Sequence, residues 1–140
     1  MNNHRKSRGF TLIEMLMTVA IISILVAIAY PGYTSYVRKA HRGEAISALM
    51  EIANAQEKFY LDCGVNSYAT SLAAARNCAG LALGYVSATA GGYYALAVTA
   101  ADATTYSLTA TAQGSQVDDT GCTVLTLTST GLKTPASGCW

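Results

Sequence analysis

The sequence predicts an α+β fold, in which one long N-terminal α-helix packs on a small antiparallel β-sheet. An apolar run occupies residues 10–30, helical spacing of apolar side chains continues as far as Tyr60, and three segments of alternating large side chains follow between residues 93 and 129. The amphipathic second half of the helix needs an apolar partner, and one face of the sheet would supply it.

The hydrophobic first half of the helix is predicted over residues 10–36. Residues 10–30 are long enough to cross a bilayer and carry Glu14 as their only charged side chain. Because a lone carboxylate is costly inside a bilayer, the position of Glu14 needs an explanation. Pro31 would normally kink or interrupt a helix, so we expect a weak point there.

The second half of the helix opens the globular part, which is predicted over residues 37–140. Its apolar stripe follows i, i+3, i+4, i+7 spacing and comprises Ile46, Leu49, Met50, Ala53 and Tyr60. Basic residues near its start lie off that stripe and are expected on a solvated face, namely Arg38, Lys39, His41 and Arg42. The alternative is that this basic group contacts acids on neighbouring subunits.

The sheet is predicted over residues 93–130. Three segments, 93–100, 105–113 and 123–129, alternate large side chains on one face. The side chains expected to cover the helix are Tyr94, Leu96, Val98, Tyr106, Leu108, Ala110, Leu125 and Leu127. Short polar connections suit an antiparallel meander.

A connection rich in glycine, alanine and serine spans residues 62–92, between the helix and the sheet. A connection of this length usually carries function or variation. Its segment 71–77 is expected to form a short helix with Ser71 near the N-cap.

The four cysteines are Cys63, Cys78, Cys122 and Cys139. Their spacing fits no zinc or redox motif, so we predict no metal or other cofactor. An even number of cysteines behind an export-type N-terminus indicates two disulfides in an oxidising compartment. Three pairings are possible. Pairing of sequence neighbours, Cys63–Cys78 and Cys122–Cys139, is favoured, and free buried cysteines are the alternative.

Composition limits the classes of function. The chain has 140 residues, of which 51% are hydrophobic and 12% charged, against roughly 25% charged in an average soluble domain. Three of its nine basic residues lie in residues 1–9, which leaves six basic against eight acidic residues from Phe10 onward. This balance makes nucleic acid an unlikely partner. No nucleophile–base arrangement or phosphate-binding motif is visible, so no enzyme is predicted.

Three interpretations compete for the N-terminus. A cleaved secretory signal explains the basic start, but the apolar core is too long and carries an acid. A plain membrane anchor explains the length and would place residues 1–9 in the cytoplasm. The third interpretation starts from the string Arg8-Gly9-Phe10-Thr11-Leu12-Ile13-Glu14, which closely resembles the class III leader of type IV pilins and pseudopilins.

The resemblance implies that a prepilin peptidase removes residues 1–9 by cutting between Gly9 and Phe10, and then N-methylates Phe10. The new amine at Phe10 would pair with Glu14, either within one chain or, as the family implies, on a neighbouring subunit, because a buried charge is tolerated when it is paired. The alternative is that Glu14 snorkels or caps the start of the helix. Pro31 occupies the place of a helix-weakening proline in pilins, close to a segment that loses helical order when subunits pack.

The resemblance extends beyond the leader. Residues 55–60 (AQEKFY) and 106–112 (YSLTATA) look like stretches of PilE-type minor pilins, as do the sequences around Cys122 and Cys139. Together they imply the type IV pilin fold, with a Cys122–Cys139 loop that holds the end of the chain to the sheet. The resemblance also implies a turn at residues 131–134.

The function predicted from this resemblance is that of a structural subunit of a type IV pilus, specifically a minor pilin incorporated into the filament or priming its assembly. Its partners would be other pilin subunits, the peptidase and the inner-membrane assembly machinery. It would be a single-pass inner-membrane protein before assembly, with a periplasmic globular part, and part of a surface pilus afterwards. The alternatives are a pilus-borne DNA-binding minor pilin for natural transformation and a type II secretion pseudopilin.

Overall fold

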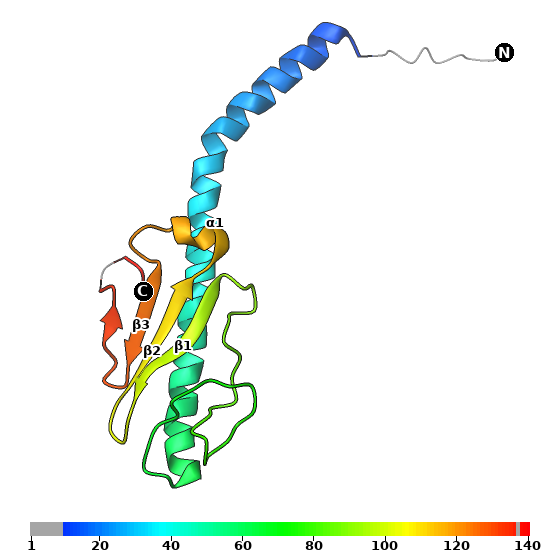
Figure 1. The fold of residues 1–140 in the computed structure, drawn as a ribbon. Helices are drawn as coiled ribbons and strands as arrows, with labels where there is room; N and C mark the ends of the chain where they lie inside the picture. The colour runs from blue at the N-terminus through cyan, green and yellow to red at the C-terminus, as the bar shows by residue number, and fades with distance from the viewer. Residues whose placement is uncertain (1–9, 137) are drawn as a thin grey trace, which may run out of the picture. The chain divides into compact units, whose positions relative to one another are not determined.

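The computed structural model describes residues 10–136 and 138–140, and Figure 1 shows the order of the elements. They are helix α1 (Leu12–Cys63), strands β1 (Tyr94–Ala101) and β2 (Tyr106–Ala112), a 3-10 helix η1 (Gly114–Asp118), and strands β3 (Val124–Thr128) and β4 (Lys133–Thr134). The chain divides into two compact units, of which the first ends at Val37 and the second is Arg38–Trp140. The expected leader, residues 1–9, lies outside the described residues.

The first unit contains only the beginning of α1. Pro31 lies inside the helix without ending it. Among the described residues, α1 is long and apolar enough to span a membrane, by length and composition alone. Its large apolar side chains up to Tyr36 are exposed within the chain, so this surface has to be covered by something else.

The second unit contains an antiparallel sheet with the strand order β1-β2-β3-β4 (Figure 1). The three predicted strands are confirmed. Their predicted inward face is also buried, except that Val98 is half-buried beside a register shift in β1. The fourth strand was not predicted: residues 133–134, expected in a turn, pair with Thr126 and Leu127 of β3. Two residues are too few to show an alternating pattern.

The helical stripe that covers this sheet differs from the predicted one. The buried residues of α1 are Arg42, Ala45, Leu49, Ile52, Gln56 and Phe59. Of the predicted stripe, Leu49 is fully buried, Ile46 and Ala53 are half-buried and pack against the core, Tyr60 is half-buried, and Met50 is exposed. The prediction was displaced from the centre of the buried face because the observed stripe contains two polar side chains, Arg42 and Gln56, which hydrophobic spacing alone does not select.

The connection between α1 and β1 contains no helix at residues 71–77, contrary to expectation. Backbone groups of this segment bond to the chain that follows instead. Asn77 and Ala82 exchange two N–H···O bonds of 2.9 Å, and the N–H of Ser71 donates to the carbonyl of Leu81. At its far end, Ala88 pairs with Ala95 of β1, so the connection extends the sheet at that edge.

The turn between β1 and β2 is organised by Asp102. Its Oδ1 accepts the backbone N–H groups of Thr104 at 2.6 Å and Thr105 at 2.7 Å. These two backbone hydrogen bonds are the main reason that the pKa of this exposed carboxyl is lowered to about 2. The carbonyl of Asp102 also accepts the N–H of Tyr68 at 3.0 Å, which ties the connection to the turn.

We predict that Asp102 makes the turn sensitive to acid. Its pKa in the folded chain, about 2, lies below its ordinary value of 3.8. Its contribution to stability is therefore complete above the ordinary value and is lost as the pH falls through about 2. In an NMR titration of the full chain in detergent, the amide signals of Thr104 and Thr105 should shift with a midpoint near 2. A midpoint near 4 would show that these hydrogen bonds do not stabilise the ionised form of Asp102.

Candidate functional site

The N-terminal candidate residues meet at the start of α1. The hydroxyl oxygen of Thr11 accepts the N–H of Glu14 at 3.3 Å, and the Glu14 carboxylate lies 3.5 Å from the N–H of Thr11. This reciprocal arrangement is a capping box, with Thr11 as the N-cap and Glu14 as the third helical residue. Phe10 precedes the cap and is exposed, and Gly9 lies outside the described residues.

The capping contacts place the Glu14 carboxylate within one turn of the backbone of Phe10. The expectation that Glu14 caps the helix start matches these contacts, yet both of them are long for hydrogen bonds. The side chain therefore keeps the capacity to accept a stronger, charged donor at the same end of the helix.

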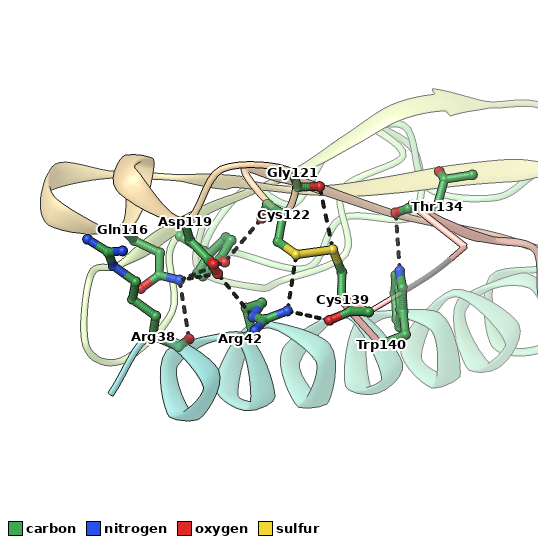
Figure 2. The surroundings of a disulfide bond; sticks show 11 residues. Arg38, Arg42, Gln116, Asp119, Gly121, Cys122, Thr134, Cys139 and Trp140 are labelled. Atoms are coloured by element: carbon green, nitrogen blue, oxygen red, sulfur yellow. Dashed lines mark hydrogen bonds and ion pairs between the residues drawn. A yellow bond between two sulfur atoms is a disulfide. The ribbon is translucent and has the colours of Figure 1, made fainter. Parts of the chain in front are cut away.

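The C-terminal loop is bounded by a disulfide that Figure 2 shows between Cys122 and Cys139. Arg42 reaches toward it from α1. Its Nη1 donates to the carbonyl oxygen of Gly138 at 2.7 Å and lies 3.0 Å from Sγ of Cys122. One helical side chain thus holds both ends of the loop.

Arg42 also forms an ion pair with Asp119. Its Nε lies 3.0 Å from Oδ2 of Asp119, and the two side chains are only 11% and 14% exposed. The N–H of Nε is not aimed at that oxygen, so the contact is electrostatic rather than a hydrogen bond. The prediction that Arg42 lies on a solvated face was wrong, because its charge is compensated inside the protein.

Gln116 of η1 joins the same cluster and is fully buried. Its amide nitrogen lies 3.0 Å from Oδ2 of Asp119 and donates to the carbonyl of Arg38 at 3.2 Å (Figure 2). It also lies 3.2 Å from the hydroxyl of Tyr94. Burial is the largest cause that raises the pKa of Tyr94. That hydroxyl therefore stays protonated at neutral pH and donates to the carbonyl of Cys122 at 3.4 Å.

His41, also expected on a solvated face, packs against the β1 end of the connection. Its ring stacks on Tyr93 with centroids 3.5 Å apart, and its Nδ1 lies 3.1 Å from Oε1 of Gln116. The other two basic residues of that group differ. Arg38 is partly exposed and pairs with Asp118 at 3.5 Å, and Lys39 is exposed.

The connection is held to α1 by a second buried polar side chain. The Gln56 amide donates to the carbonyl of Ala69 and accepts its N–H, both at 2.8 Å. Ala69 lies within the loop that the Cys63–Cys78 disulfide bounds. Sequence reasoning missed Gln56 and Gln116. For Gln56 the available signal was its position, because it lies seven residues after Leu49 and therefore on the same, buried face of the helix.

Nothing in the described residues forms a group of three or more His, Cys, Asp or Glu side chains that could hold a metal ion. The neighbouring carboxylates Asp118 and Asp119 form separate ion pairs with Arg38 and Arg42.

A long helix with an exposed apolar start, a four-stranded sheet and a disulfide-bounded C-terminal loop together define a type IV pilin. A family model described as "Type IV minor pilin ComP, DNA uptake sequence receptor" matches residues 31–126, which is more than half of the chain, and the chain belongs to this family. A second model, the prokaryotic N-terminal methylation motif, matches residues 4–30. The resemblance seen in the sequence is confirmed.

The curated relatives agree. The fimbrial protein EcpC of Eikenella corrodens is 43% identical over 58 residues, which cover 41% of this chain and 38% of that protein. The major pilin PilE of Neisseria gonorrhoeae is 40% identical over 58 residues, with 41% and 35% covered. The chain thus matches little more than a third of their length. A solved type IV pilin from Shewanella oneidensis shares the fold, with a TM-score of 0.50, 27% identity, and coverage of 74% of this chain and 97% of that one.

We predict that Arg42→Ala destabilises the folded unit by about 3–5 kcal/mol, because it leaves Asp119 buried without its partner. The matched control is Arg38→Ala, which removes a partly exposed pair 3.5 Å apart and should cost less than about 1 kcal/mol. Denaturant unfolding of the full chain in detergent, with disulfides intact, measures both. Equal losses of unfolding free energy in the two variants would show that the buried ion pair contributes no more to stability than the exposed one.

Proposed function

We propose that this chain is a structural subunit of a type IV pilus, and specifically a minor pilin that enters the filament or primes its assembly. The observation that carries the proposal is the start of α1, where an entirely exposed apolar surface begins beside a single carboxylate. Lipid would cover this surface before assembly, and the helices of neighbouring subunits would cover it in the filament. The role is mechanical rather than catalytic.

Assembly depends in this proposal on Glu14. Removal of residues 1–9 by a prepilin peptidase would release a cationic amine at Phe10, which is then N-methylated. A carboxylate held weakly by Thr11 can exchange that contact for the amine of a neighbouring subunit, and the charge-assisted bond is the stronger one. This pairing would set the axial position of each added subunit, and Pro31 would let the helix adjust as subunits pack.

This order of assembly steps gives each part of the chain a proposed location. Residues 10–36 would hold the subunit in the inner membrane before assembly, with residues 37–140 in the periplasm. The two disulfide-bounded loops, Cys63–Cys78 and Cys122–Cys139, fit that oxidising compartment. The partners would be other pilin subunits and the inner-membrane assembly machinery.

We predict that Glu14→Gln leaves membrane insertion and cleavage intact but lowers incorporation into sheared filaments about tenfold, because the buried amine loses its partner. Immunoblots of membrane and filament fractions measure the two steps separately. The matched control, Asp118→Asn, removes one carboxylate from the exposed surface and should change neither. Normal incorporation of the Glu14 variant would refute the pairing.

A second candidate function is DNA binding, which the description of the family supports. The charge of this chain argues against it: of the basic residues in the folded unit, Arg38, Arg42 and Arg76 are paired with acids. Three others remain, Lys39, Lys58 and Lys133. A gel-shift titration of the full chain with duplex DNA decides, since binding through phosphates falls steeply with salt. No retention at low salt would remove this candidate.

A further inference from the structure

Three tyrosines project from the end of the apolar first half of α1. Tyr30, Tyr33 and Tyr36, here called the tyrosine stripe, are 66%, 68% and 74% exposed. Successive members are three residues apart, so their rings lie within an arc of about 120° and are spread over about 9 Å of the helix axis. They are the only aromatic side chains between Phe10 and Val37 in the sequence. The stripe is therefore a distinct feature on one side of this segment.

The length of the apolar segment does not fix how deep it lies in a bilayer. From Leu12 to Tyr36 the helix is about 37 Å long, whereas the hydrocarbon core of a bilayer is about 30 Å thick. No charged side chain occurs between Glu14 and Arg38, so charge does not fix the depth within that range either. The excess of about 7 Å matches the thickness of the interfacial layer on one side of a bilayer. One end of the segment has to lie in that layer.

Backbone chemistry indicates that the end at Pro31 is the one that leaves the hydrocarbon. Pro31 has no N–H, so the carbonyl of Ala27, one turn earlier, has no helical donor. An unpaired carbonyl is costly in hydrocarbon, but at its boundary it can accept a hydrogen bond from water or a lipid headgroup. Ser23 lies deeper in the segment and is compatible with lipid, because its hydroxyl donates to the carbonyl of Val19 at 2.7 Å.

A tyrosine side chain suits this boundary. Its ring buries apolar surface in the acyl chains while its hydroxyl bonds to water or to headgroup oxygens, and tyrosine is enriched at membrane interfaces for that reason. The stripe runs along the helix axis across the boundary, with Tyr30 nearest the hydrocarbon and Tyr36 nearest the water. The residues between its members are small, at positions 31–32 and 34–35, and leave the rings free to reach the headgroups.

We propose that the tyrosine stripe binds the headgroup layer of the bilayer and fixes the depth of α1 while the subunit awaits assembly. The inference rests on the proposed function for the membrane-bound state, and adds to it the group that holds the helix in register with the bilayer. Removal of residues 1–9 would take away Arg5, Lys6 and Arg8, the basic residues at the opposite end of the segment. The stripe would then be the interfacial anchor that the mature chain retains.

Spin labels measure this depth in the full chain, reconstituted into vesicles of phosphatidylethanolamine and phosphatidylglycerol. The four native cysteines are paired in disulfides, so a single introduced cysteine takes the label. Ser35→Cys places the label on the side of the helix opposite the stripe, and Val26→Cys places it within the apolar run. Oxygen concentrates in hydrocarbon, whereas a nickel chelate stays in water. The label at Ser35 should relax mainly through the chelate, and the label at Val26 mainly through oxygen.

Substitution of the stripe identifies the group that sets the depth. Replacing all three tyrosines with leucine extends the apolar segment to residue 36, and should lower chelate accessibility at Ser35 at least about threefold as the helix sinks. Replacing them with tryptophan keeps interfacial rings and should leave the depth unchanged. The matched control converts Ile21, Ile24 and Ile28 to leucine in the same helix and should also leave the depth unchanged.

Two results would overturn the anchor. One is a label at Ser35 that is as accessible to oxygen as the label at Val26 in the otherwise unchanged chain. The other is a leucine variant that keeps its depth; if its incorporation into sheared filaments falls at the same time, the rings contact neighbouring helices instead of headgroups. Failure of the proposed function gives a different result, because a segment that does not enter the bilayer would leave the Val26 label accessible to the chelate.

Discussion

The structure depends on one constraint: the large apolar side chains of the first half of α1 are exposed, and nothing in residues 10–136 and 138–140 covers them. Burying one large apolar side chain stabilises by about 1.5–3 kcal/mol, so a helix face of this size does not stay in water. In the proposed function, the same side chains would pack against lipid before assembly and against other helices in the filament. The single carboxylate at the start of this surface, Glu14, would then be the polar group that exchanges one partner for another.

The second half of α1 belongs to the folded unit, which would keep one arrangement during the proposed transfer from membrane to filament. Its buried stripe is apolar except at two points, Arg42 and Gln56. Each of these reaches a loop that a disulfide bounds, Gly138 and Cys122 in one case and Ala69 in the other. Leaving a buried polar group unsatisfied costs about 1–3 kcal/mol, so the loops cannot leave the helix without that loss. The folded unit is therefore suited to being moved as a whole.

Much of this fold follows from local patterns. Alternating side chains identified β1, β2 and β3, and the long apolar run with its single charge identified the start of α1. What the sequence could not reveal was the set of contacts made by polar residues. Arg42 and His41 resemble a solvated basic cluster in sequence, and only the fold brings Asp119, Gln116 and Tyr93 against them. The segment at residues 71–77 has helical composition, yet its backbone bonds to residues 81–84 are non-local and override it.

The two halves of α1 belong to one proposal, in which the chain is cut before Phe10, leaves the membrane, and enters a pilus with its folded unit unchanged. Mass spectrometry of intact subunits from sheared and purified pili tests this proposal. The expected species starts at N-methylated Phe10 and contains two disulfides. Pili that lack the chain, or that contain it with residues 1–9 still attached, would contradict the proposal.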